Sequence, residues 1–366
     1  MLLSFASIIP YTINQLSWKF EDERIDNFFV LGNYTIRQGA GSDFRTRNKT
    51  FSIENNSRND KGMNYFLKQP MFFSSENVLS IIREQGFYNI IHKSEHLKSK
   101  IGNHIPIFFD YNTNDAILIL EWISNAKNFR DYLSLLPEKP ILCTADIAKK
   151  IGGLLHNFHD SFRGFEQDFK TQKPLFFNAN PLPVFTIDFD ILDFQQQFKS
   201  DLRIIIKEIN EDKDHNFKLI IEDCQRYWQQ ESHPTLINGD FKPANVLIRE
   251  NAEKKDIDVF FIDWEYAIWG SPEFDLATFY FYQLRVKDFT IDNEDSVLFT
   301  ALLEGYYGVE KPDAETLKKI TAFCKIRIID HWSQNRLNDA KDEEDKNNKI
   351  AVLQKTLELI NSLEIN

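Results

Sequence analysis

The chain is poor in cysteine, with only Cys143, Cys224 and Cys324 among its 366 residues. These three are scattered, show no CxxC spacing and cannot all pair, so the sequence does not indicate a disulfide framework. Free thiols persist in reducing compartments, and the cysteine usage therefore favours a cytoplasmic protein.

Long apolar runs are also missing. No stretch approaches the about 18 consecutive apolar residues of a membrane span, so we expect no membrane partner. The segment Leu2–Ile9 is apolar, but the first basic residue is Lys19 and no A-x-A pattern follows. The segment therefore lacks the positively charged start of a signal peptide, and we expect it to pack against the protein.

Basic residues are outnumbered. The sequence has 43 Lys and Arg against 55 Asp and Glu, which gives a formal net charge of −12. General nucleic-acid binding needs a basic surface, so this balance argues against a nucleic-acid partner. It is compatible with a cationic small substrate, although acidity also serves solubility alone.

The chain is, in contrast, long and rich in phenylalanine. Its 366 residues suffice for two lobes that each have a core, and 33 phenylalanines indicate that much of that core is aromatic. The hydrophobic share of 42% and the charged share of 27% are ordinary for a globular protein. The sequence does not indicate an oligomeric state.

The first third of the chain is typical of a β-rich lobe. Short apolar segments alternate with turn residues, and Ser74 and Ser75 offer an N-cap to a helix that carries Ile81 and Ile82. A polar stretch at 112–115 predicts the turn of a hairpin. The expected strands are 34–38, 49–54, 64–69, 105–111 and 116–122.

The remainder of the chain favours helices. Residues 145–162 carry apolar side chains at spacings of three and four, residues 194–221 also favour a helix, and helices resume from 274. Three short elements, 235–238, 245–249 and 259–263, lie between these helical regions. His156 and His159 lie on the first of the helices.

The most informative stretch is 238–245, which reads Asn-Gly-Asp-Phe-Lys-Pro-Ala-Asn and is followed by Ile262-Asp263-Trp264-Glu265. It places Asn245 five positions after Asp240, and Asp263 at the end of an apolar run. Phosphoryl transfer uses these groups, because one carboxylate accepts the proton of the attacking hydroxyl while an amide oxygen and a second carboxylate hold Mg²⁺ on the phosphates. Protein kinases carry the same roles in H-R-D-L-x-x-x-N and D-F-G.

This pattern resembles the Gly-Asp catalytic loop of the aminoglycoside phosphotransferase and choline kinase-like family. The resemblance implies an α+β, bilobal protein-kinase-like fold, with a small antiparallel sheet lobe at 1–121 and a larger, mainly helical lobe at 122–366. It also implies ATP and Mg²⁺ as cofactors and a small-molecule hydroxyl as the substrate. The sequence D-W-E at 263–265 and the lack of an A-P-E motif argue against a protein kinase.

The resemblance assigns roles within the catalytic loop. Asp240 is the expected base, and Asn245 and Asp263 are the expected Mg²⁺ ligands, since this hard cation prefers oxygen. Lys242, before Pro243, is placed to neutralise charge on the transferred phosphate, or is simply an exposed lysine of the loop. Two further residues are expected to support the loop, and these are Asn238 and Asp275.

The roles of Asn238 and Asp275 each have an alternative interpretation. Asn238 stands where the family usually has His, a change that Asn tolerates because it also donates and accepts, but which leaves reduced activity open. Asp275 follows Gly270 and Pro272 and precedes Leu276 and Ala277, the context in which the family's Asp hydrogen-bonds the catalytic-loop backbone. A plain carboxylate at a helix N-terminus is the alternative for Asp275.

The family's nucleotide lobe needs a strand Lys paired with a helix Glu. Lys68 supplies the former, and Glu84, sixteen residues later, is preferred over Glu76. The glycines Gly39 and Gly41 fall where a loop would cover the phosphates with backbone N–H groups, although an ordinary hairpin turn also explains them. The expected hinge, whose backbone would contact the adenine, is Glu121, Trp122 and Ile123.

The acceptor site is the least defined part of the sequence. Glu265, Tyr266 and Trp269 follow the expected metal ligand directly. Acidic groups suit the amines of an aminoglycoside, and aromatic rings suit a quaternary ammonium such as choline, although packing alone also explains the tryptophans. His156 and His159 invite a metal site, but the family has a core feature there.

Two functions remain open from the sequence. The first is an ATP-dependent small-molecule kinase, favoured by Lys68, Asp240, Asn245 and Asp263. The second is a catalytically weak or inactive kinase-fold protein that binds nucleotide as a regulatory or interaction module, favoured by Asn238 and by the poor glycine loop.

Overall fold

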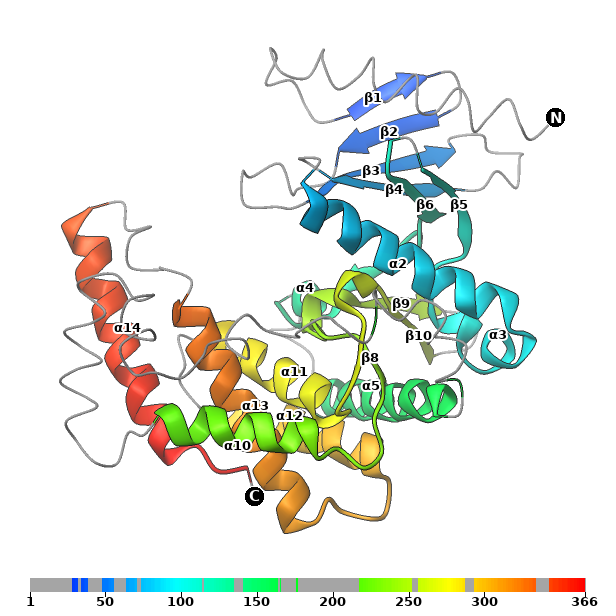
Figure 1. The fold of residues 1–366 in the computed structure, drawn as a ribbon. Coiled ribbons are helices and arrows are strands. Elements are labelled where there is room, and N and C mark those ends of the chain that lie inside the picture. Colours follow the sequence, from blue (N-terminus) through cyan, green and yellow to red (C-terminus); the bar gives the residue numbers. More distant parts are fainter. Residues whose placement is uncertain are drawn as a thin grey trace. The chain divides into compact units, whose positions relative to one another are not determined.

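The computed structural model describes residues 28–31, 34–38, 48–55, 64–70, 74–113, 115–134, 141–163, 165, 176, 217–251, 256–286, 293–333 and 342–365. Two compact units are present (Figure 1). The first comprises Met1–Ala126 with Arg249–Glu265, and the second comprises Lys127–Ile248 with Tyr266–Asn366. Residues 249–265, expected in the second lobe, belong to the first unit, where the His104 ring hydrogen-bonds the carbonyl of Val259.

An antiparallel sheet organises the first unit, in the order β1-β2-β3-β4-β6-β5. All five expected strands are present within a few residues of their predicted bounds, and one more strand precedes them. The strands are β1 (Phe28–Leu31), β2 (Tyr34–Gln38), β3 (Asn48–Asn55), β4 (Tyr65–Pro70), β5 (Phe108–Asn112) and β6 (Ile117–Glu121).

Three helical segments accompany this sheet, namely α2 (Ser75–Lys93), α3 (Glu95–Ile101) and the 3-10 turn η1 (Gly102–His104). The expected cap is confirmed, since the Ser74 hydroxyl accepts a hydrogen bond of 3.2 Å from the backbone N–H of Asn77. Helix α2 runs along the sheet (Figure 1) and buries Ile81, Phe87 and Ile91. Burying these apolar side chains stabilises the helix on the sheet.

Strand β9 (Val246–Asn251) is the middle strand of a second sheet, between β7 (Lys127–Asn128) and β10 (Asp256–Phe261). The Arg249 guanidinium bonds Asp258 at 3.0 Å across β9 and β10. These strands carry the chain from the catalytic loop to Asp263, as the sequence predicts for its second and third short elements.

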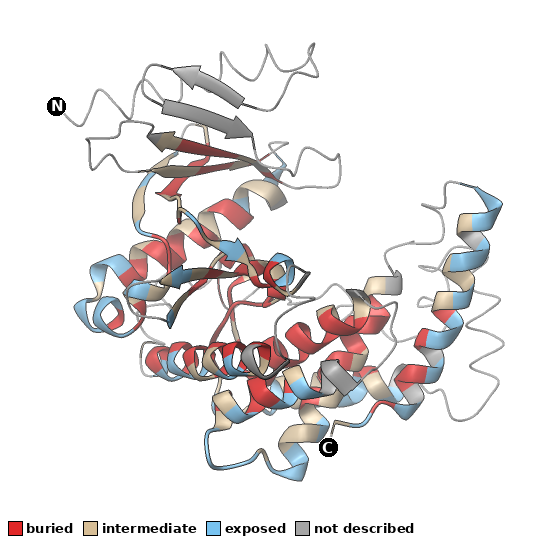
Figure 2. Ribbon diagram, turned by 180° about the vertical axis from the view of Figure 1, so that it is seen from behind, coloured by how far each residue is buried: buried red, intermediate tan, exposed pale blue. Residues whose placement is uncertain are grey.

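The second unit is mainly helical. Helices α5 and α12 pack so closely at Gly152 and Gly305 that a Cβ on either glycine would overlap the backbone of the opposite helix. Figure 2 shows the buried residues concentrated on α5, α11 and α13. The helices are α4 (Phe129–Ser134), α5 (Ile141–Phe162), α10 (Phe217–Gln229), α11 (Glu273–Val286), α12 (Asn293–Tyr307), α13 (Ala314–Ser333) and α14 (Glu343–Ser362).

Four short elements remain among the described residues, and three of them, two strands and a 3-10 turn, belong to the second unit. Strand β8 (Thr235–Ile237) pairs with β11 (Ile268–Gly270), and the 3-10 turn η3 spans Pro243–Asn245. A further 3-10 turn, η4 (Trp264–Tyr266), lies where the chain passes between the units. These short elements position the motif residues.

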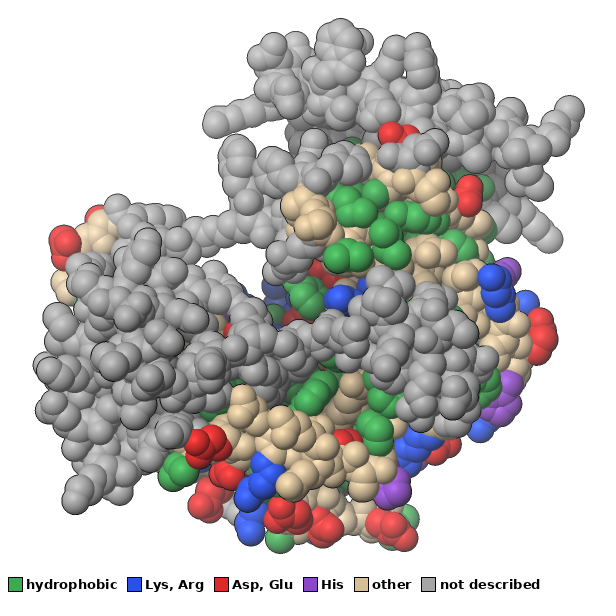
Figure 3. Space-filling model, viewed as in Figure 1, with side chains coloured by type: hydrophobic (Ala, Val, Ile, Leu, Met, Phe, Trp, Pro, Cys, Tyr) green, Lys and Arg blue, Asp and Glu red, His purple; other side chains and the backbone are tan. Residues whose placement is uncertain are grey.

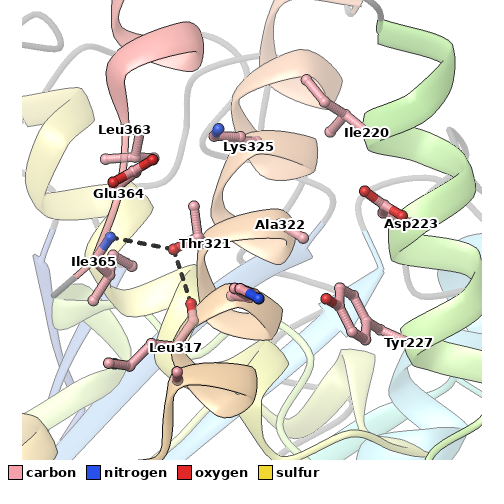
Figure 4. Close-up of a pocket in the computed structure, with 12 residues that line it drawn as sticks. Ile220, Asp223, Tyr227, Leu317, Thr321, Ala322, Lys325, Leu363, Glu364 and Ile365 are labelled. Atoms are coloured by element: carbon pink, nitrogen blue, oxygen red, sulfur yellow. Dashed lines mark hydrogen bonds between the residues drawn. The ribbon is translucent and has the colours of Figure 1, made fainter.

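A pocket of about 410 Å³ lies between α10, α13 and the C-terminal residues 363–365 (Figure 4). The Thr321 hydroxyl accepts a bond of 3.3 Å from the N–H of Ile365 and donates one of 2.8 Å to the carbonyl of Leu317. Both acidic and basic residues line the pocket, and none of the predicted site residues does.

On the face drawn in Figure 3, acidic and basic side chains of the described residues are interspersed. Among the described helices, none combines the length and the apolarity that crossing a membrane requires.

Candidate active site

The predicted lysine–glutamate pair forms within the first unit. Lys68 lies on β4, opposite Leu118 of β6, and Glu84 lies on α2. The Lys68 ammonium is 2.8 Å from Oε2 of Glu84. Both residues are buried, since Lys68 is 5% exposed and Glu84 is 2% exposed. An ion pair this buried is fixed in place, because separating its partners would leave a buried charge without a counter-charge.

Lys68 also contacts two residues that follow β10. Its ammonium bonds Oδ1 of Asp263 and lies 2.8 Å from Oε2 of Glu265. Oxygens of Glu84, Asp263 and Glu265 all lie within 4.8 Å of one another. One lysine among three carboxylates leaves the ionised cluster with excess negative charge, which favours a cation beside it.

The cluster shifts the pKa values of its members. Burial raises the pKa of Glu84, and although Lys68 opposes this, the charges of Asp263 and Glu265 add to it, which brings the pKa to about 7. Burial alone would lower the pKa of Lys68, but the carboxylates of Asp263, Glu265 and Glu84 raise it well above its usual value. The lysine is therefore a permanent cation.

Glu265 lies in this cluster. Besides Lys68, its Oε2 accepts a hydrogen bond of 2.6 Å from the Asn48 amide, and its carbonyl accepts one of 2.9 Å from Arg83. Glu265 was expected to bind the acceptor, whereas its carboxylate is buried against Lys68. The D-W-E pattern does not indicate that Asn48 hydrogen-bonds Glu265.

Asp263 is held in an unusual backbone conformation, with φ of 64°. Asp tolerates this left-handed region better than most residues. The next residue, Trp264, stacks on Phe87 of α2 with ring centroids 3.9 Å apart and donates a bond of 3.3 Å to the carbonyl of Phe261. Trp264 is thus a packing residue that anchors the chain beside Asp263, whose side chain stays 26% exposed.

The predicted catalytic loop, residues 238–245, folds within the second unit. Pro243 starts the turn η3, and the side chain of Asn245 donates a bond of 3.0 Å to the carbonyl of Asp240. Because the Asn245 amide nitrogen is used in this way, its oxygen is the atom left to bind a cation. Asp240 is buried, and its carboxylate bonds the ammonium of Lys242.

Asp275, at the start of α11, bonds the catalytic-loop backbone. Its carboxylate accepts hydrogen bonds of 2.8 Å from the N–H of Asn238 and 2.9 Å from that of Gly239. The imidazole of His159 lies 3.3 Å from the same carboxylate and 2.8 Å from the hydroxyl of Tyr306. His159 is therefore part of the buried support of the loop.

Asn238, which replaces the usual His, also supports the loop. Its side-chain oxygen accepts a bond of 3.2 Å from the backbone N–H of Asp240. Gly239 has φ of 79°, and a Cβ there would overlap the carbonyl oxygen of Tyr266. The tight turn before Asp240 therefore requires glycine.

Two residues that the sequence analysis missed contact Asp240. The Tyr282 hydroxyl donates a bond of 3.1 Å to its Oδ1, and Nη2 of Arg327 lies 3.3 Å from the same oxygen. Tyr282 lies on α11 and Arg327 on α13, 42 and 87 residues from Asp240. No local pattern signals such distant partners; only the packing of the helices brings them to the loop.

The remaining predicted residues are spread over several elements. Glu121 is the last residue of β6. The backbone N–H of Trp122 donates a hydrogen bond of 3.0 Å to the carbonyl of Asn64, and this N–H therefore already has an acceptor. Ile123 is buried, and Trp269 lies in β11 opposite Leu236. Tyr266 ends η4, and Gly39 and Gly41 lie outside the described residues.

The model of the phosphotransferase enzyme family matches residues 144–314. A search of curated protein sequences finds no match.

Solved structures with similar folds cover most of the chain. Ethanolamine kinase from Plasmodium vivax is 15% identical with a TM-score of 0.54, over 88% of this chain and 81% of its own. Choline kinase LicA from Streptococcus pneumoniae is 13% identical with a TM-score of 0.51, over 97% and 99%. Amicoumacin kinase hAmiN, in complex with AMP-PNP, Ca²⁺ and Ami, is 13% identical with a TM-score of 0.58, over 96% and 94%.

These likenesses confirm the expected protein-kinase-like fold of mixed helices and antiparallel sheet. The resemblance to the phosphotransferase enzyme family is likewise confirmed, and it covers the segment that carries the catalytic loop and Asp263.

Proposed function

We propose that the protein is an ATP-dependent phosphotransferase that moves the γ-phosphate of ATP to a hydroxyl of a small molecule, such as an aminoglycoside, choline, or a similar amino alcohol or sugar. The observation that carries this proposal is the position of Lys68, which bonds both Glu84 and Asp263. Kinases use this lysine–glutamate pair to hold nucleotide phosphates, next to the Asp that binds their metal.

The residues present fit Mg²⁺-ATP. Asp263 offers a partly exposed carboxylate, and Asn245 an amide oxygen, and both are hard oxygen ligands of the kind that Mg²⁺ prefers. When bound, the metal would neutralise charge on the phosphates. Lys68 would bind the α- and β-phosphates, and Glu84 would orient it. The hinge 121–123 and the glycines Gly39 and Gly41 are proposed to hold the rest of the nucleotide.

Asp240 is the proposed base. It would accept a hydrogen bond from the acceptor hydroxyl, orient the hydroxyl and take its proton as the bond to phosphorus forms. Lys242 already bonds the Asp240 carboxylate and would neutralise the charge that moves with the phosphoryl group. Asn238 and Asp275 would keep the base in position through their bonds to the loop backbone.

A cytoplasmic location is part of the proposal. Cys224 and Cys324 are buried free thiols, which is what a reducing compartment preserves. Burial raises the pKa of both thiols, so neither is activated for reaction.

The alternative, a nucleotide-binding module without turnover, was favoured by Asn238. The Asn238 side chain accepts a hydrogen bond from the backbone N–H of Asp240, and this support of the loop favours the kinase over the alternative. The test is an ATP-consumption screen with aminoglycosides, choline, ethanolamine, homoserine and sugars as acceptors. Turnover that depends on an added acceptor supports the kinase, whereas nucleotide binding without any turnover supports the alternative.

A further inference from the structure

Arg327 lies beside the proposed base and has an unusual environment for a cation. Only 8% of the residue is exposed, and its guanidinium lies 5.3 Å from the ring centroid of Phe281, 5.7 Å from that of Tyr282 and 6.0 Å from that of Phe274. Rings at these distances attract a cation weakly and hold its plane in position. The guanidinium is therefore preorganised for a ligand next to Asp240.

The hydrogen-bonding capacity of Arg327 is underused. A guanidinium has five N–H donors in a planar fork. Its Nη2 makes one long contact of 3.3 Å with Asp240, and its buried Nε has no hydrogen-bond partner among the described residues. A buried donor without a partner costs free energy, and a planar anion that accepted from this fork would remove that cost.

Among the described residues, positive charge also exceeds negative charge around this position. The Tyr282 ring has three cations near it: Lys242 at 5.5 Å, Arg285 at 5.6 Å and Arg327 at 5.7 Å from its centroid. Asp240 is the carboxylate that bonds Lys242 and Arg327, and the buried Asp330 lies one turn beyond Arg327 on α13. Counting both acids, the three cations still leave a positive charge.

This arrangement disfavours a quaternary ammonium at the same place. The Tyr282 ring, which could otherwise bind such a group, is already surrounded by protein cations. A second cation would be repelled by them. A carboxylate, in contrast, would pair with the guanidinium in the bidentate geometry that arginine favours.

We propose that the acceptor carries a carboxylate a short distance from its reactive hydroxyl, as in a hydroxy acid or a hydroxyl-bearing amino acid, and that Arg327 binds this carboxylate. The proposal rests on the proposed function, because it assumes that the hydroxyl is placed at Asp240. An amino acid would retain an amine, so the acidic character of the chain does not conflict with it.

The test compares acceptors that differ only in charge. Homoserine and 3-hydroxypropionate are each assayed against their neutral carboxamides, with choline and ethanolamine as cationic acceptors whose two-carbon spacer matches that of 3-hydroxypropionate. We expect kcat/KM for at least one acid to exceed that for its carboxamide by at least tenfold, since a hydrogen bond between two charged groups is stronger than one between a charged and a neutral group. The Arg327→Met variant should reduce this ratio to near one, mainly through KM.

Arg226→Met is the matched control, since Arg226 also pairs with an acid, Asp223, and lies over a ring, that of Tyr227, but on the exposed surface of α10. This variant should leave the ratio unchanged. Thermal unfolding of both variants checks that they remain folded, and Arg327→Lys, which keeps the charge without the fork, should retain part of the preference.

Three results would overturn the proposal. One is turnover of choline, ethanolamine or aminoglycosides with none of the acids. Another is an equal loss of kcat for acids and carboxamides in Arg327→Met, which would make Arg327 a positioning residue for Asp240 only. The third is calorimetry, with a non-hydrolysable ATP analogue present, that detects no acid binding to the wild type. If the acids bind through Arg327 but no acceptor is phosphorylated, the anion site stands and the kinase function fails.

Discussion

The carboxylate of Asp275 accepts a hydrogen bond of 2.9 Å from the backbone N–H of Gly239, the residue directly before the proposed base. Its other oxygen accepts one of 2.8 Å from the N–H of Asn238, so one buried side chain satisfies two donors of the loop. A carboxylate that accepts backbone bonds in this way fixes the loop conformation, because each donor would otherwise be buried without a partner.

Replacing Asp275 should therefore affect both stability and activity. We expect Asp275→Ala to lower the free energy of unfolding by about 2–5 kcal/mol, since it leaves two buried N–H groups without an acceptor. It should also lower kcat, because Asp240 is no longer held. Denaturant unfolding measures the first effect, and Asp160→Ala, at an exposed site on α5, should change stability by less than about 0.5 kcal/mol. Equal stability of the two variants would contradict this role.

Gly239→Ala tests the tight turn directly. Gly239 and Gly308 both have positive φ, at 79° and 67°, but a Cβ at Gly239 would overlap the Tyr266 carbonyl, whereas a Cβ at Gly308 has nothing within 4 Å. Each substitution should cost about 1–2 kcal/mol for the left-handed backbone, and only Gly239→Ala should cost clearly more. Chemical denaturation of both variants gives the comparison, and the same cost at both positions would show that the loop can shift.

Asp263→Ala should abolish binding of Mg²⁺-ATP while the fold is kept. The variant removes a proposed metal ligand and leaves Lys68 paired with Glu84 and Glu265. Calorimetric titration with Mg²⁺-ATP is the measurement. Asp258→Ala is the control, since Asp258 lies on the same stretch of chain but pairs with Arg249. Unchanged affinity and an unchanged rate in Asp263→Ala would show that the metal lies elsewhere.

A second buried network gives a pH prediction. Burial would raise the pKa of Glu231, but hydrogen bonds from Lys319, the N–H of His233 and Ser271 hold it below its usual value. Because the folded state holds the proton less tightly than the unfolded state, the stabilisation is present at neutral pH and is lost as pH falls through about 4.5 and below.

Lys319→Met should remove this contribution. We expect the variant to be about 1–3 kcal/mol less stable than the wild type at pH 7, and the difference to shrink as pH falls toward 3.5. Unfolding free energies measured across this range test the prediction. A difference that stays constant with pH would mean that Lys319 stabilises the protein by packing alone.

Local sequence patterns were enough for most elements of the fold. The Ser74 cap, the strand that carries Lys68 and the hairpin of β5 and β6 each follow from residues that are close in the sequence. The same holds for the turn η3, where Pro243 and Asn245 lie in the catalytic motif. Such features are determined by propensity and periodicity, which the sequence displays directly.

The contacts that complete the site were not predictable in this way. Arg327 and Tyr282 reach Asp240 only because α11 and α13 pack beside the catalytic loop, and Asn48 reaches Glu265 over 217 residues. Glu265 was expected in the acceptor site because it follows Asp263, yet its carboxylate lies with Lys68. Sequence proximity does not determine the direction of a side chain.

Asp240 is proposed to orient and deprotonate an acceptor hydroxyl. Asp240→Asn keeps the shape of the side chain and removes the proton acceptor, and Tyr282, Arg327 and Lys242 still surround it. Single-turnover phosphoryl transfer, with enzyme in excess over ATP, measures the step directly. We predict that the variant binds ATP as the wild type does but transfers phosphate at least about 10²-fold more slowly. Transfer within a few-fold of the wild-type rate would contradict the account.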